Sequence, residues 1–169
     1  MKAHIIGLAG SGKTTLARWL AGTYAIGACD LDDVVYDRVT GERPATEIER
    51  RLEEIGRLPG WVTEGAYHQP WLKQHLDAAE IIVWLDISFP ICAKRIVLRH
   101  VGAELAGRNP HPGWRKMARF LNYTRQTASR QRAETKCLID PFSAKVMHCR
   151  SSTNVKAFQA HRSGASGFR

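Results

Sequence analysis

The sequence of 169 residues predicts a single α/β domain, in which helices cover both faces of a five-stranded parallel sheet. The length and a hydrophobic fraction of 44% suit one buried core. Strand and helix signals alternate along the chain, and a glycine-rich loop at residues 7–14 stands between a strand and a helix. We expect the domain to span residues 1–162 and residues 163–169 to form a flexible tail.

The glycine-rich loop fills the phosphate-loop pattern G-x-x-x-x-G-K-[ST] at every required position. Its glycines let several backbone N–H groups point at one anion, and the helix that follows offers its positive dipole end. Lys13 is expected to contact the β- and γ-phosphates, and the Thr14 hydroxyl to ligate Mg²⁺. Residues 3–6 suit a buried strand and residues 15–21 have helical spacing. The expected nucleotide-binding residues are Gly7, Ala9, Gly10, Ser11, Gly12, Lys13, Thr14 and Thr15.

The remaining elements follow in order. The expected strands cover residues 25–31, 60–65, 81–86 and 145–149, and the expected helices cover residues 44–57, 70–77, 88–105, 114–135 and 153–160. Pro44, Pro70 and Pro90 each suit the first turn of a helix, where the missing N–H costs nothing. Pro110 and Pro112 predict a loop over residues 107–113.

Acidic residues stand at the ends of three expected strands. Ligands of open parallel sheets bind beyond the carboxyl ends of the strands, which makes Asp30, Asp32, Glu64 and Asp86 candidates for function. Phosphoryl transfer needs one carboxylate near Mg²⁺ and one near the acceptor hydroxyl. We assign Asp30 or Glu64 to the metal and Asp32 to the acceptor. For each acid, a surface carboxylate or a helix cap is the alternative interpretation.

Two arginines, Arg95 and Arg99, are four residues apart, so a helix would place both guanidinium groups on one face. Bidentate donors suit phosphate oxygens and the charge that develops on a transferred phosphoryl group. One further arginine could close on the nucleotide from the next helix, although most of that set is expected to face solvent. The set is Arg115, Arg119, Arg125, Arg130 and Arg132.

The net charge of +9 lies in one segment: residues 94–136 hold eleven Lys or Arg against two acids, whereas the rest of the chain holds fourteen of each. This segment suits arginines that surround transferred phosphates, a nucleic-acid-binding surface, or a solvated helical face. The sequence leaves these alternatives open.

Composition argues against other classes of protein. The apolar run at residues 81–85 is far too short to span a membrane, and the N-terminus carries no cleavable signal pattern, which predicts a cytoplasmic protein. The four cysteines are widely separated, and neither they nor the seven histidines show metal-ligand spacing.

These motifs together resemble the small phosphate-loop kinases of the adenylate-kinase-like class, and most closely the bacterial DNA topology modulation proteins, over residues 3–160. The pieces are the loop itself, Leu31-Asp32, the tryptophan strand that ends in Glu64-Gly65-Ala66-Tyr67, the strand at residues 82–86, and the pair Arg95 and Arg99 where that class has its lid arginines. The resemblance implies a sheet of order 2-3-1-4-5, ATP on the phosphate loop, a short lid near residues 101–113, and adenine near residues 150–154.

The chain also departs from its relatives. Adenylate kinases begin the phosphate loop with Pro-Gly, where this chain has Ala9-Gly10, and shikimate kinases carry a glycine triplet after the third strand that is absent here. The acceptor and the oligomeric state therefore stay open.

The function that we expect is Mg·ATP-dependent phosphoryl transfer to a small hydroxyl or phosphate acceptor. The assigned roles are Lys13, Arg95, Arg99 and Asp32 in catalysis, Asp32, Glu64 and Tyr67 in acceptor binding, and Thr14 and Asp30 at the metal. The alternatives are an NTPase without transfer and a nucleotide-dependent regulator that binds nucleic acid through residues 94–136.

Overall fold

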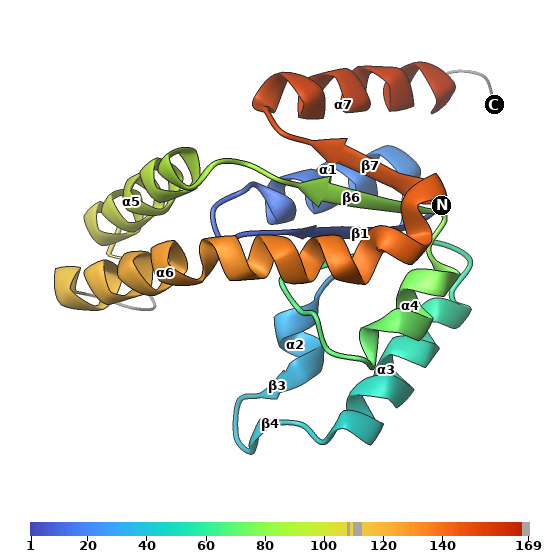
Figure 1. The fold of residues 1–169 in the computed structure, drawn as a ribbon, viewed down its shortest axis with the longest axis horizontal. Coiled ribbons are helices and arrows are strands. Elements are labelled where there is room, and N and C mark those ends of the chain that lie inside the picture. Colours follow the sequence, from blue (N-terminus) through green and yellow to red (C-terminus); the bar gives the residue numbers. More distant parts are fainter. Residues whose placement is uncertain (108, 110–112, 167–169) are drawn as a thin grey trace.

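The computed structural model describes residues 1–107, 109 and 113–166 and contains a five-stranded parallel sheet (Figure 1). The strands are β1 (Lys2–Gly7), β2 (Gly27–Asp30), β5 (Trp61–Gly65), β6 (Ile81–Leu85) and β7 (Val146–Cys149), in the spatial order β2-β5-β1-β6-β7. Numbered along the chain among themselves, these strands have the order 2-3-1-4-5. The predicted fold class and strand order are confirmed.

Helices lie on both faces of this sheet. They are α1 (Lys13–Tyr24), α2 (Leu31–Val35), α3 (Ala45–Arg57), α4 (Leu72–Ala78), α5 (Phe89–Leu105), α6 (Trp114–Ile139), the 3₁₀ helix η1 (Asp140–Lys145) and α7 (Ser152–Ser166). In Figure 1, α7 and α1 lie on one side of the sheet and α3, α4 and α6 on the other. The helices α5 and α6 extend together beyond the carboxyl ends of β1 and β6.

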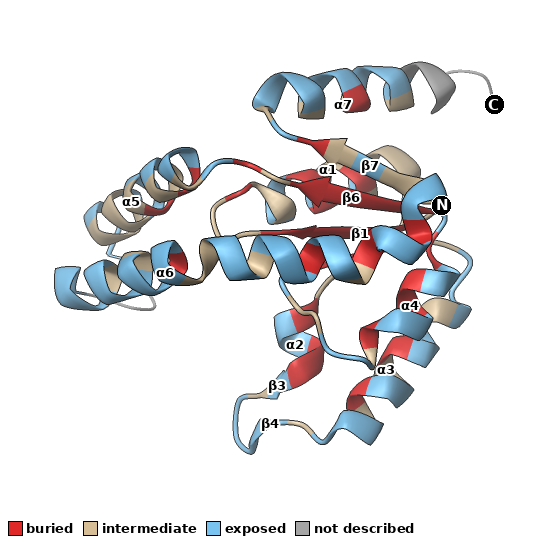
Figure 2. Ribbon diagram, in the orientation of Figure 1, coloured by how far each residue is buried: buried red, intermediate tan, exposed pale blue. Residues whose placement is uncertain are grey.

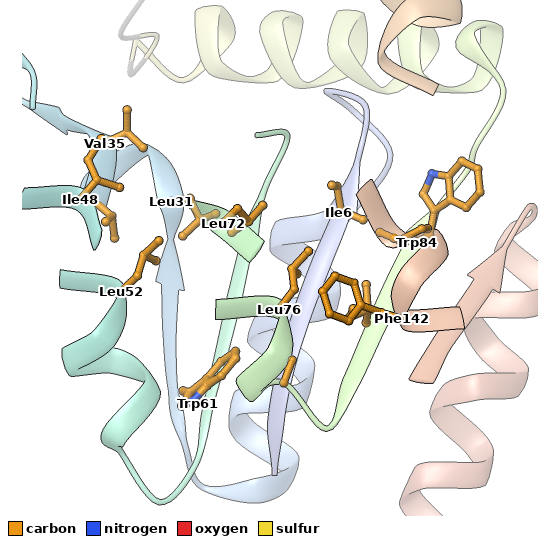
Figure 3. Packing of buried hydrophobic residues seen from close by; sticks show 14 residues of the cluster. Ile6, Leu31, Val35, Ile48, Leu52, Trp61, Leu72, Leu76, Trp84 and Phe142 are labelled. Carbon is orange, nitrogen blue, oxygen red and sulfur yellow. The ribbon is translucent and has the colours of Figure 1, made fainter. Parts of the chain in front are cut away.

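Alternation along β1 supplies both halves of the core, because successive side chains of a strand point to opposite faces. Ile6 packs in the cluster that contains the α3, α4 and η1 residues labelled in Figure 3, among them Leu52, Leu76 and Phe142. Ala3 and Ile5 pack on the other face against α1 and α7. Figure 2 shows the resulting pattern, with the central strands buried and the outward faces of the helices exposed.

Several boundaries differ from the predictions. The second strand ends at Asp30 instead of residue 31, because Asp30 caps the short helix α2 through a hydrogen bond from the Asp32 N–H. A two-stranded hairpin, β3 (Tyr36–Asp37) and β4 (Gly41–Glu42), follows. The helix α6 continues beyond residue 135 to Ile139, which is buried in the core.

The structure describes the predicted lid and tail only in part. Residues 101–105 belong to α5, and four residues of the predicted lid, 108 and 110–112, lie outside the described residues. Residues 163–166 of the predicted tail continue α7, which ends six residues later than predicted because nothing in this stretch interrupts the helix as a proline would. Within the described part of the chain, we find no helix whose length and apolarity suffice to cross a bilayer.

Candidate functional site

The phosphate loop connects β1 to α1, and two of its glycines are required by close backbone contacts. Gly10 has φ of 78°, and a Cβ there would lie 2.6 Å from the Cys92 carbonyl oxygen in α5. A Cβ on Gly7 would lie 2.5 Å from the Leu85 carbonyl oxygen in β6. Both distances are shorter than any carbon–oxygen contact tolerates, so these glycines let α5 and β6 approach the loop.

Lys13 is the first residue of α1, and its ammonium lies inside the loop. Its Nζ donates to the Leu8 carbonyl at 3.3 Å, across the turn that the hydrogen bond from Ser11 N to Leu8 O closes. Burial lowers the pKa of Lys13, and the carboxylates of Glu64, Asp30 and Asp32 oppose that shift. Lys13, bonded to one loop carbonyl and influenced by three carboxylates, is a positive centre next to the loop N–H groups.

Glu64 is the acid that meets the phosphate loop directly. It is the penultimate residue of β5, it is only 4% exposed, and its Oε1 accepts a hydrogen bond from Thr14 Oγ1 at 2.5 Å. Burial raises the pKa of Glu64, while the Thr14 hydrogen bond and Lys13 pull that pKa down. The arrangement places a buried carboxylate beside the hydroxyl that the sequence assigned to Mg²⁺.

Asp30, the last residue of β2, and Asp32, in the first turn of α2, make different contacts. Asp30 Oδ1 accepts from the Asp32 N–H at 2.9 Å as the cap of α2, and burial raises the pKa of its carboxyl group. Asp32 Oδ1 accepts a hydrogen bond from Tyr67 Oη at 2.7 Å, and the Tyr67 ring lies beside Trp71. Burial, together with the bond to Asp32, raises the pKa of Tyr67, so the phenol stays a donor at alkaline pH. Tyr67 therefore contacts Asp32, the residue predicted to bind the acceptor.

Arg95 joins three parts of the site. Its Nη1 donates to the Ser11 carbonyl at 2.7 Å and to the Gly10 carbonyl at 3.4 Å, and its Nη2 donates to Ser152 Oγ at 3.0 Å. Arg99, one turn further along α5, is exposed and has no carboxylate partner among the described residues. Arg95 thus ties the loop to α7, and Arg99 is free to meet a ligand.

The five arginines of α6 differ in their surroundings. Arg132 Nη2 donates to Asp86 Oδ2 at 2.6 Å, and Arg130 lies 3.5 Å from Glu134. The other three are exposed and have no carboxylate partner within the described ranges: Arg115, Arg119 and Arg125. Asp86 also accepts from His148 Nε2 at 2.9 Å. The fourth strand-end acid is therefore paired with Arg132 and hydrogen-bonded to His148.

One cavity of about 540 Å³ brings most of the predicted residues together. The predicted residues that line it are Ala9, Gly10, Gly12, Lys13, Thr14, Thr15, Asp30, Asp32, Glu64, Arg95 and Arg99. Gly7, Ser11 and Tyr67 lie outside this lining. Ile96 and Phe120 also line the cavity, and neither was predicted, because an apolar residue on a helix carries no signal that separates a cavity wall from the core.

A second cavity of about 410 Å³ adjoins the loop on the side of α7. It shares Gly12, Thr15 and Arg95 with the first cavity and adds Ser152 and Val155 from the start of α7. The expected position of adenine, near residues 150–154, is next to this cavity. Nothing in the sequence around Ser152 indicates its hydrogen bond with Arg95.

The site has few protein ligands for a metal ion. No three His, Cys, Asp or Glu side chains of the described ranges lie close enough together to hold an ion by themselves. Mg²⁺ commonly takes one or two protein ligands and completes its octahedron with phosphate oxygens and water. The Thr14 hydroxyl beside the Glu64 carboxylate fits that pattern.

Comparisons with known proteins agree on the fold. No protein-family model matches the chain. The chain is 31% identical over 108 residues to the chloroplastic shikimate kinase of Solanum lycopersicum, which covers 55% of this chain and 36% of that protein. The chain therefore spans about a third of the length of this curated relative.

Two solved structures resemble the whole chain. The shikimate kinase from Acinetobacter baumannii, in complex with shikimate, has a TM-score of 0.51 at 16% identity and covers 99% of this chain and 95% of its own. The shikimate kinase from Bacteroides thetaiotaomicron has a TM-score of 0.60 at 12% identity, and the match covers 98% of this chain and 97% of that kinase. At these identities the likeness shows the fold alone, an α/β fold in which helices flank a five-stranded parallel sheet, as in these shikimate kinases. The comparisons do not establish the DNA topology modulation family.

Proposed function

We propose that this protein is an ATP-dependent phosphotransferase that acts on a small acceptor. The observation that carries the proposal is the convergence, in one cavity, of a phosphate loop, three cations and three carboxylates. The cations are Lys13, Arg95 and Arg99, and the carboxylates are Asp30, Asp32 and Glu64. Phosphoryl transfer requires positive groups around the transferred phosphoryl group and an acid close to the attacking hydroxyl, and this cavity offers both.

Each side chain has a role in this proposal. The loop N–H groups and Lys13 hold the β- and γ-phosphates, and Arg99 stabilises the charge that develops on the transferred group. Arg95 keeps the loop and the start of α7 together, which positions the nucleotide. Asp32, held by Tyr67, accepts a hydrogen bond from the acceptor hydroxyl and orients it.

The metal would be held by Thr14, with Glu64 contributing directly or through water. The contact between these two side chains supports Glu64 rather than Asp30 as the metal-side carboxylate, because Asp30 caps α2. Bound Mg²⁺ would supply charge neutralisation between the β- and γ-phosphates. The identity of the nucleotide as ATP rests on the resemblance to phosphate-loop kinases, as does the expected closeness to the DNA topology modulation proteins.

The test is ADP release from ATP in the presence of nucleosides, nucleoside monophosphates, sugars and hydroxy acids, with Mg²⁺ present. Lys13→Ala should reduce acceptor-dependent ADP release at least a hundredfold while the melting temperature stays within a few degrees of the parent. Lys136→Ala, an exposed lysine on α6, is the matched control and should be fully active. Full activity of folded Lys13→Ala would refute the proposal, and hydrolysis that no acceptor alters would point to an NTPase.

A nucleic-acid-binding regulator is the second candidate, supported by the exposed, unpaired arginines of α6 and by the exposed Tyr123 beside them. Binding through phosphates falls steeply with salt, so a salt series of DNA affinity separates the two functions. Nanomolar binding with a steep slope would favour the regulator. Weak binding that is lost at 0.2 M salt would favour the phosphotransferase.

A further inference from the structure

A third cavity, of about 320 Å³, lies where β1 and β6 end. It shares Ala66 with the cavity of the phosphoryl-transfer site, and Arg150 in its lining begins the segment expected near adenine. Ala128, Arg132 and Thr135 of α6 are among the residues that line it. We call it the α6 cavity. Six of its lining residues matter here: Gly7, Leu8, Trp84, Ser88, Arg132 and Arg150. Its volume is within the range of cavities that bind small molecules.

Two arginines give the α6 cavity a positive character. Arg132 uses Nη2 for Asp86, and because its side chain is 60% exposed its remaining N–H groups are open to a ligand. Arg150 is exposed and has no carboxylate partner in the described part of the chain. The negative charge of Asp86 is already met by Arg132 and by the hydrogen bond from His148. An oxyanion would therefore find open donors and no uncompensated acid.

The α6 cavity also has an apolar, rigid wall. Trp84 stacks on His148 with ring centroids 4.2 Å apart and an interplanar angle of 4°, which fixes the indole. Leu8, Ile87 and Phe89 complete the apolar surface. A ligand that fits has an apolar ring at one end and an oxyanion at the other, as an aromatic carboxylate or an aryl phosphate monoester has.

The position of the α6 cavity connects it to the phosphoryl-transfer site. One wall is the beginning of the phosphate loop, Gly7 and Leu8. Another is Ser88, whose carbonyl accepts the first two hydrogen bonds of α5, the helix that carries Arg95. A ligand in this cavity would contact both the phosphate loop and the start of α5. It would favour the relative arrangement of these two elements to which it binds best. We propose that the α6 cavity is a second ligand site, for a ring-bearing carboxylate or phosphate monoester, that modulates nucleotide affinity.

Calorimetric titration tests this site on the full chain saturated with a non-hydrolysable ATP analogue and Mg²⁺, which occupies the phosphate loop. The probes are benzoate and phenyl phosphate. Benzyl alcohol, which lacks the anion, and inorganic phosphate, which lacks the ring, are the control probes. We expect benzoate or phenyl phosphate to bind at least tenfold more tightly than either control probe. The one that binds more tightly shows whether the site prefers a carboxylate or a phosphate monoester.

Variants locate the binding. Arg150→Ala should weaken it at least tenfold, and Arg125→Ala, an exposed arginine of α6 outside the cavity, should leave it unchanged. Ala128→Leu fills the cavity and should abolish binding, whereas Ala133→Leu, on the exposed side of the same helix, should not. The bound probe should also change the affinity for the ATP analogue at least threefold, and the analogue should change the affinity for the probe by the same factor.

Three results would overturn the proposal. They are the absence of binding by both ring-bearing anions, equal binding by Arg150→Ala and the parent, and binding without any effect on the affinity for the analogue. None of them bears on the phosphotransferase proposal, which depends on ADP release and Lys13.

Discussion

Two buried histidines should make the stability of this fold depend strongly on pH. His4 in β1 and His75 in α4 both contact the Thr63 hydroxyl, His4 through Nδ1 and His75 through Nε2, each at 2.9 Å. Their exposures are 0% and 3%. Burial, aided by the neighbouring His75, lowers the pKa of His4 from 6.5 to about 3, and burial lowers that of His75 to about 4.

The sign of the effect follows from these shifts. Both histidines bind protons more readily in the unfolded chain, so stability is complete above pH 6.5 and falls as the pH drops toward 4. Each histidine contributes a slope of about 1.4 kcal/mol per pH unit in that window. At pH 4.5 the two together would remove about 5 kcal/mol, which is comparable to the whole stability of many domains.

Urea unfolding between pH 7.5 and 4.5 measures this slope. His4→Asn and His75→Gln each replace a titrating ring with an amide that can still reach Thr63, so each variant should lose about half of the slope. Subtracting each variant's slope from the parent's slope cancels the contributions of the carboxylates. This matters because burial raises the pKa values of Asp30 and Glu64, whereas it lowers those of the two histidines. Variants that keep the parent's slope between pH 6.5 and 4.5 would refute the reasoning.

Two further predictions concern the phosphate loop and the acceptor side. Gly10→Ala should lower nucleotide affinity at least tenfold, because the φ of Gly10 is 78° and the new Cβ would meet the Cys92 carbonyl. Gly22→Ala in α1 is the control: its Cβ meets no atom, and the substitution should stabilise the fold by about 0.5–1 kcal/mol in thermal unfolding. Equal nucleotide affinities for the two variants would contradict this. Tyr67→Phe removes the hydrogen bond to Asp32 and should lower kcat about tenfold with an unchanged KM for ATP, and a change in KM alone would argue against a role at the acceptor.

The sequence predicted the sheet well, because its signals are local. The continuous apolar run of β6 and the phosphate-loop pattern after β1 can each be recognised within ten residues. The end of α6 was less predictable. Residues 136–139 read Lys-Cys-Leu-Ile and carry no signal that marks a helix end. The burial of Ile139 in one cluster with Phe142 explains why the helix extends that far.

Contacts between distant residues could not be predicted. Asp86 meets Arg132 across 46 positions and His148 across 62, and no spacing rule relates residues so far apart. Arg95 reaches Ser152 across 57 positions for the same reason. The sequence identified Arg95 as a phosphate-binding candidate from its spacing to Arg99, but its function as a tie between loop and α7 depends entirely on topology.

Asp30 and Glu64 illustrate why the acids of the site needed the structure most. In sequence both are acids at strand ends, and either suits a metal. An acid followed by Leu-Asp-Asp is also a good helix cap, and Asp30 uses an oxygen for that purpose. Glu64 is followed by Gly65, where an added Cβ would lie 3.0 Å from the Leu31 side chain, so any side chain at that position would force Leu31 of α2 to shift. The Glu64 carboxylate stays buried and turns to Thr14. We therefore assign Glu64 to the metal in preference to Asp30, because Asp30 caps a helix and Glu64 does not. A strand-end pattern in the sequence does not reveal this difference.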